Sequence, residues 1–128
     1  MKPIDAVTSD VIGAAMDIHR EIGPGLLESV YEAILARKLA RLGYVVEVQK
    51  ALGFRYEDME FPAAFKIDLL VDSRLVVELK SVERLQPVHS KQLLTYLRLM
   101  KLPVGLLVNF GCDTLKEGIK RVVNNHDD

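Results

Sequence analysis

The chain has 128 residues and a formal net charge of −1, with 49% hydrophobic and 27% charged residues. These values fit a single globular domain over residues 1–128, and they argue against a protein that grips nucleic acid through bulk positive charge. No apolar run is long enough to cross a membrane, the N-terminus lacks a signal-peptide layout and Cys112 has no partner cysteine, so we expect a cytoplasmic protein.

The N-terminal part of the chain predicts two amphipathic helices. Apolar residues recur at spacings of three and four over Ile4–Ile22, which is typical of a helix with one buried face. Gly23-Pro24-Gly25 ends that helix, and a second one is expected to begin near Leu26 and to stop before Gly43.

Strands are predicted next, at Tyr44–Leu52, Phe54–Tyr56, Ala63–Val71 and Arg74–Lys80. Between the second and third of these strands, Asp58–Pro62 is expected to be a turn or loop. The polar pair Asp72-Ser73 joins the last two strands and suits an antiparallel hairpin.

The C-terminal part predicts a helix at Val88–Met100, a strand at Val104–Phe110 and a last helix that starts at Thr114 and continues through Val123. A strand, a crossover helix and another strand form a βαβ unit with parallel strands. The expected fold class is therefore mixed α/β (α+β), with a mixed sheet flanked by helices.

Two carboxylates and a lysine stand out on the adjacent strands. Side chains alternate along a strand, so Glu78 and Lys80 share one face, and antiparallel pairing brings Asp68 roughly opposite Glu78. A carboxylate pair beside an ammonium group can hold a divalent cation and polarise a water, as metal-assisted phosphodiester hydrolysis requires. The alternative is an ordinary half-buried strand in which a salt bridge balances Asp68.

The helices add further polar candidates. His89, Gln92 and Tyr96 recur at spacings of three and four, so they share one helix face. That face either lies in solvent or forms a polar wall that holds phosphate or water near the carboxylates. Glu28, in the first turn of the second helix, is either a residue favoured by the helix dipole or a third acid aimed at the metal.

In combination and in this order, these segments resemble the G-x-x-E-x-x-Y protein family, a branch of the PD-(D/E)xK nuclease superfamily. The resemblance runs from about Ile12 to Asn124 and implies a restriction-endonuclease-like core. The segments that carry it are residues 23–31, 67–71, 77–80, 92–97 and 105–111.

The resemblance assigns a role to each candidate residue. Asp68 and Glu78 correspond to the two acids of the superfamily pattern and Lys80 to its lysine, while Ile67 stands where that pattern has a proline. Glu28 corresponds to a glutamate that some relatives add to the metal site. Gln92 and Tyr96 match a helix motif of nucleases that process DNA ends.

The expected mechanism uses Mg²⁺, or Mn²⁺ in its place, with Lys80 orienting a water or offsetting charge on the phosphate. The expected metal ligands are Asp68, Glu78, the carbonyl group of Leu79 and Glu28. Gln92 would hydrogen-bond to water or phosphate, and the substrate-binding residues would be Tyr96, Tyr31 and His89, with the tyrosines stacking on a base or closing the site.

Three functions remain open at this point. The chain is a metal-dependent nuclease acting on DNA, or a catalytically silent nuclease-fold module that binds nucleic acid or a protein partner, or a structural protein with an ion-paired strand. The presence of both acids and of Lys80 favours the first function over the second. One domain of this size offers little surface to grip a duplex, which favours a homodimer or a protein partner in either of the first two cases.

Overall fold

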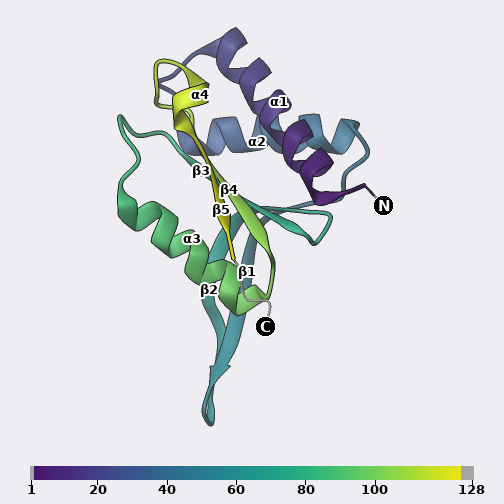
Figure 1. Cartoon of the computed structure of the whole chain (residues 1–128), viewed down its shortest axis with the longest axis vertical. Helices are drawn as coiled ribbons and strands as arrows, with labels where there is room; N and C mark the ends of the chain where they lie inside the picture. The colour runs from purple at the N-terminus through teal and green to yellow at the C-terminus, as the bar shows by residue number, and fades with distance from the viewer. Residues whose placement is uncertain (1, 125–128) are drawn as a thin grey trace.

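The computed structural model describes residues 2–124, in which helices cover a single mixed sheet (Figure 1). The elements are α1 Ile4–Ile22, α2 Glu28–Arg41, β1 Val46–Tyr56, β2 Met59–Val71, β3 Leu75–Lys80, α3 Pro87–Met100, β4 Val104–Asn109, α4 Leu115–Gly118 and β5 Ile119–Val123. None of the helices in this described part combines the length and apolar content needed to cross a bilayer.

The sheet has the strand order β1-β2-β3-β4-β5. Strands β1, β2 and β3 pair antiparallel in sequence, whereas β3 and β4 are parallel and are connected through α3. Strand β5 pairs antiparallel with β4. The predicted mixed sheet, the β2–β3 hairpin and the βαβ unit are thus confirmed.

The core lies on both faces of the sheet. Helices α1 and α2 bury one face in a cluster that includes the fully buried Ile18, Leu35 and Leu39. Helix α3 covers the other face through Leu93 and Leu97 (Figure 1). Strand β3 lies in the middle of the sheet and is buried along nearly its whole length, so the polar residues at its end are held by a rigid element.

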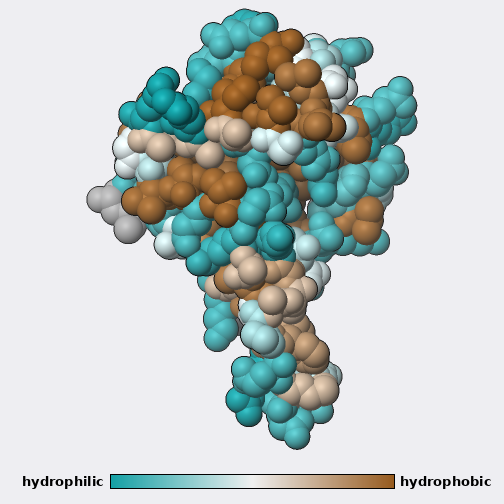
Figure 2. Space-filling model, turned by 180° about the vertical axis from the view of Figure 1, so that it is seen from behind, coloured by the Kyte–Doolittle hydropathy of each residue, from teal (hydrophilic) through white to brown (hydrophobic). Residues whose placement is uncertain are grey.

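The β1–β2 hairpin is longer than the sequence predicts. A turn is present at Asp58 as expected, but the loop predicted for residues 59–62 is wrong, because β2 begins at Met59 and β1 continues to Tyr56. Phe54 pairs with Phe61 across the hairpin, and their rings stack with centroids 5.4 Å apart. This aromatic pair extends the ladder into an arm that projects from the body of the protein, as Figures 1 and 2 show.

The C-terminal helix begins after Thr114 as expected, but its predicted continuation through Val123 is wrong. Helix α4 ends at Gly118, and residues Ile119–Val123 form β5 along the edge of β4. An unpaired edge of β4 would leave backbone groups without partners, and a β-branched segment is well suited to pair with it. At Gly118 a Cβ atom would lie 2.4 Å from the Asn109 carbonyl oxygen, so the chain turns from helix to strand in close contact with β4.

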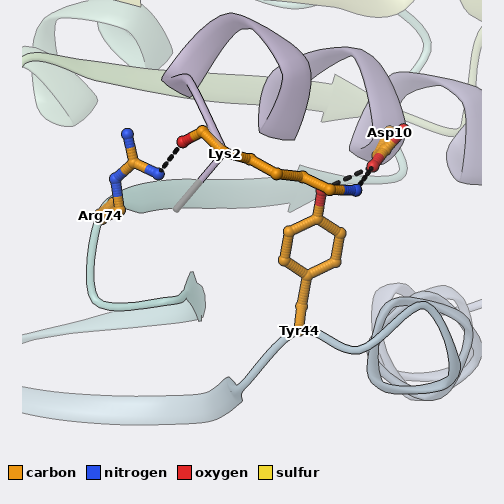
Figure 3. A network of polar contacts seen from close by, with 4 residues as sticks. All are labelled: Lys2, Asp10, Tyr44 and Arg74. Carbon is orange, nitrogen blue, oxygen red and sulfur yellow. Dashed lines mark hydrogen bonds and ion pairs between the residues drawn. The ribbon is translucent and has the colours of Figure 1, made fainter.

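A polar network fastens the N-terminal segment to the body of the protein (Figure 3). The Lys2 ammonium pairs with the Asp10 carboxylate at 3.0 Å, and the Tyr44 hydroxyl donates to the same carboxylate. Arg74, in the β2–β3 turn, donates to the Lys2 carbonyl at 2.6 Å. These contacts tie α1 to the segment before β1 and to the hairpin that carries Asp68.

A buried asparagine fixes the chain that leaves β3. The Asn109 side chain is 0% exposed, accepts a hydrogen bond from the Val82 N–H at 3.0 Å and donates to the Val82 carbonyl at 2.9 Å. The Phe110 N–H donates to the Lys80 carbonyl at 2.8 Å. The end of β4 therefore holds Lys80 and the residues after it in one conformation.

We expect Asn109→Ala to lower the free energy of unfolding by about 2–4 kcal/mol, because both partly buried backbone groups of Val82 lose their partner. Urea unfolding followed by circular dichroism measures this loss. Thr95→Ala is the control, since its hydroxyl donates to the Lys91 carbonyl on an exposed helix face. A loss for Asn109→Ala no larger than that of the control would contradict the role of Asn109 in holding Val82 and the chain after β3.

Candidate active site

The polar site lies where β2 and β3 separate. The backbone register pairs Leu69 with Val77, and the next pair in that register would be Asp68 with Glu78. At this position carboxylate oxygens replace backbone carbonyls as the hydrogen-bond acceptors. The Asp68 N–H donates to Glu78 Oε2 at 2.8 Å, and the Leu79 N–H donates to Asp68 Oδ2 at 2.8 Å. Each carboxylate is thus held by the backbone of the strand opposite.

The electrostatics of the site centre on Glu78, which is only 5% exposed. The pKa of its carboxyl group is raised to about 8, first by burial and then by the charge of Asp68, against smaller opposing effects of the Asp68 N–H and the Lys80 ammonium. A buried carboxylate beside another is costly to ionise. At neutral pH, Glu78 without a cation therefore tends to keep its proton.

Lys80 supplies the positive charge that the structure places near the two acids. It is the last residue of β3 and is half-buried, and its charge acts to lower the pKa of Glu78. Its backbone is fixed by the hydrogen bond from Phe110. Asp68, Glu78 and Lys80 are therefore brought together, as the strand parity predicts.

Two residues that sequence analysis did not single out belong to the same site. Glu32 is buried on α2, and Gln49 on β1 donates from Nε2 to Glu32 Oε2 at 2.6 Å and to Asp68 Oδ1 at 3.0 Å. Burial first, and then the charges of Asp68 and Glu28, raise the pKa of Glu32, while the Gln49 hydrogen bond lowers it. The spacing of four between Glu28 and Glu32 was a usable signal, since it puts both on one helix face.

Glu28 does not join the two central carboxylates. It is exposed as the first residue of α2, and its Oε2 accepts from the Ser81 N–H at 3.3 Å. Among residues 2–124 no group of three or more His, Cys, Asp or Glu side chains is placed to hold a metal ion. The three-acid set expected from the sequence is therefore not formed, and Glu28 instead lines a pocket of about 380 Å³ with Leu26, Leu27, Ser29 and Ser81.

The three polar residues expected on one face of α3 have different surroundings. Burial, followed by the charges of Glu78 and Asp68, raises the pKa of the Tyr96 hydroxyl, so this ring lies near the carboxylates, stacked on Phe65 at 4.6 Å. Gln92 is exposed and donates to neither carboxylate within the described chain. His89 caps the helix, because its Nδ1 accepts from the Gln86 N–H at 2.9 Å.

Tyr31 has a position that excludes stacking on a base, one of the two roles considered for it. It is 0% exposed and its ring stacks on Phe110, with centroids 4.3 Å apart. Its hydroxyl donates to the Gly23 carbonyl at 2.6 Å and accepts from the Leu26 N–H at 3.1 Å. Tyr31 therefore fastens the α1–α2 turn from inside the core and has no ring face free for a base.

One of the comparisons with known proteins identifies a superfamily. A family model of the PD-(D/E)XK nuclease superfamily matches residues 5–122. No curated protein matches the chain. Among solved structures the chain is similar to the crystal structure of SSO0001, with 16% sequence identity and a TM-score of 0.46 over 94% of this chain and 79% of that one.

We expect the stability of the metal-free protein to fall as pH rises from about 4.5 to about 8, because over this range folded Glu78 keeps a proton that the unfolded chain releases. Glu78→Gln removes this loss, so above about pH 8 the variant should be more stable than wild type by up to about 5 kcal/mol, the free energy that corresponds to a pKa of about 8 against 4.5. The difference should shrink towards about pH 4.5.

Urea unfolding in EDTA across this pH range tests the expectation. Glu21→Gln, which changes an exposed carboxylate on α1, is the matched control and should follow the wild-type pH profile. A Glu78→Gln profile parallel to wild type would show that Glu78 does not carry the raised pKa.

Proposed function

The chain belongs to the PD-(D/E)XK nuclease superfamily, and we propose that it is a Mg²⁺-dependent nuclease that hydrolyses phosphodiester bonds, with DNA as its substrate. The observation that carries this proposal is that the Asp68 and Glu78 carboxylates each accept a backbone hydrogen bond from the opposite strand where β2 and β3 separate, with Lys80 beside them. A structural ion pair would need no second carboxylate buried against the first.

The oxygen atoms that Asp68, Glu78 and the Leu79 carbonyl offer are suitable ligands for a divalent cation. Carboxylate and carbonyl oxygens are the hard donors that Mg²⁺ prefers, and this ion commonly takes only one or two protein carboxylates and keeps several waters. Asp68 and Glu78, with the Leu79 carbonyl, would hold it. The raised pKa of Glu78 supports this fit, because a buried carboxylate next to another favours a positive charge between them. Mn²⁺ has similar ligand preferences and would substitute.

When bound, such a cation lowers the pKa of a coordinated water and offsets negative charge on the phosphate. Lys80 orients the attacking water or balances the charge that develops on the phosphate in the transition state. Its fixed backbone and half-buried stem limit the positions its ammonium group can take. Tyr96 closes the site on the α3 side, and Gln92, one turn earlier, hydrogen-bonds to phosphate or water at the open edge.

We also assign the chain to the G-x-x-E-x-x-Y branch of the superfamily, and the α1–α2 turn supports this finer assignment. Gly25 has φ +111°, a conformation that favours glycine, and Tyr31 holds the same turn through Gly23 and Leu26. This turn starts α2 at Glu28, next to the Ser81 N–H. The motif thus sets where the helix begins relative to the end of β3.

We expect cleavage of labelled DNA in the presence of Mg²⁺ or Mn²⁺, and none in EDTA. Asp68→Ala, Glu78→Ala and Lys80→Ala should each reduce the rate by about 10²-fold or more, because the first two remove a ligand of the cation and the third removes the positive charge beside the reacting phosphate. Gln92→Ala should be milder, at about tenfold or less, since it removes one hydrogen bond. Gel assays with single- and double-stranded DNA and RNA measure this.

The outcomes of that assay separate the functions. Equal cleavage by wild type and Asp68→Ala would identify a contaminating nuclease. Inactivity on every substrate by a protein that binds Mg²⁺ would reject the enzyme and favour the silent binding module. Cleavage of RNA alone would correct the substrate class and leave the site assignment standing.

We further expect Mg²⁺ to raise the melting temperature of the wild-type protein, because a ligand that binds only the folded state stabilises it. Asp68→Asn should largely remove this increase, while Lys80→Ala should preserve it, since the lysine is not a ligand. Thermal scans with and without Mg²⁺ give both values. An undiminished Mg²⁺ effect in Asp68→Asn would place the cation elsewhere.

A further inference from the structure

Gln49 adopts a backbone conformation that is unusual for its place in a strand. Its φ is +51°, in the left-handed region that non-glycine residues rarely enter, although it lies inside β1. The backbone pairs on either side are Val48 with Leu69 and Lys50 with Ile67. Gln49 and Asp68 therefore face each other at a position where no backbone pair forms.

Strand β2 changes the direction of its side chains at the same point. Leu69 packs into the core cluster under α1 and α2, whereas Ile67, two residues earlier, packs into the cluster under α3. In a regular strand two such residues would share one face. The backbone irregularity at Gln49 and Asp68 thus occurs in both strands, directly at the candidate active site.

The Gln49 amide uses this position to join two acids from different elements. Its Nε2 lies 2.6 Å from Glu32 Oε2 and 3.0 Å from Asp68 Oδ1, so its two N–H groups have one carboxylate each. Asp68 Oδ2 is already held by the Leu79 N–H. Both oxygens of Asp68 therefore have a donor, and the plane of the carboxylate is fixed from two sides.

We propose that Gln49 is a positioning residue that orients the Asp68 carboxylate for the cation, with Glu32 as the buried anchor of its amide. This role rests on the proposed function, because it concerns the same metal site. Backbone strain in proteins persists where the surrounding structure enforces it, and it concentrates at functional sites. Here the strained residue is the one that contacts a ligand candidate, and outer partners of metal ligands tune metal affinity.

Gln49→Gly is the direct test, because glycine adopts positive φ freely and removes the amide without adding strain. Gln49 is exposed, so its truncation leaves no cavity in the core. We expect the melting temperature in EDTA to stay equal or rise. We expect the dissociation constant for Mn²⁺, measured by isothermal titration calorimetry, to increase about tenfold or more.

Glu57→Gly is the matched control. Glu57 has φ +55° in the turn of the β1–β2 arm, so this substitution relieves the same kind of backbone strain away from the site. Its Mn²⁺ affinity should equal that of wild type. Glu32→Ala should weaken Mn²⁺ binding less than Gln49→Gly does, because it frees the amide without removing its bond to Asp68.

A second measurement decides the proposal without metal. In EDTA, the shifts in urea midpoint for Gln49→Gly and Asp68→Ala should not add in the double variant, since both remove the same contact. Additive shifts, or wild-type Mn²⁺ affinity in Gln49→Gly, would overturn the positioning role. If wild type binds no Mn²⁺, the metal site of the proposed function fails, and non-additive shifts would still show that Gln49 holds Asp68.

Discussion

The end of the β2–β3 ladder is the constraint on which the rest of the site depends. Two strands that stop pairing leave backbone N–H groups that need acceptors, and here the acceptors are the carboxylates of Asp68 and Glu78. This arrangement keeps Glu78 buried yet hydrogen-bonded, and it keeps both acids at one place between the strands. It also explains why residues from both sides of the sheet, Glu32 on α2 and Tyr96 on α3, sense the same charges.

Several contacts outside the site fix the geometry at the end of the β2–β3 ladder. Asn109 and Phe110 fix the chain after β3, and Tyr31 fixes the turn that starts α2. None of these three residues has the exposure of a substrate contact, since each is fully buried. Their common role is to hold the elements that carry Asp68 and Glu78 in place. The two carboxylates repel each other when no cation is bound, and this repulsion destabilises the folded protein. The surrounding structure or a bound cation must offset it.

The motif around the second helix illustrates how a sequence signature can be structural and functional together. Its tyrosine, Tyr31, is buried in the core, and its glutamate, Glu28, accepts a hydrogen bond from Ser81 after β3. A second glutamate one turn later, Glu32, contacts the site through Gln49. Assigning every polar residue of the motifs to the substrate misplaces Tyr31, which completes the α1–α2 turn from inside the core. His89 also has a structural part, because it caps the start of α3.

The sequence by itself determined the mixed sheet, the central hairpin and the convergence of Asp68, Glu78 and Lys80, because strand alternation and a two-residue turn are local properties. It did not determine that residues 119–123 are a strand, because their spacing also fits a helix and only the free edge of β4 selects the extended form. Nor could it reveal Gln49 or separate Glu28 from the central acids. Those placements depend on how α2 packs over the sheet and on which residues of β1 and β2 face each other, and both are set by long-range contacts that no local pattern encodes.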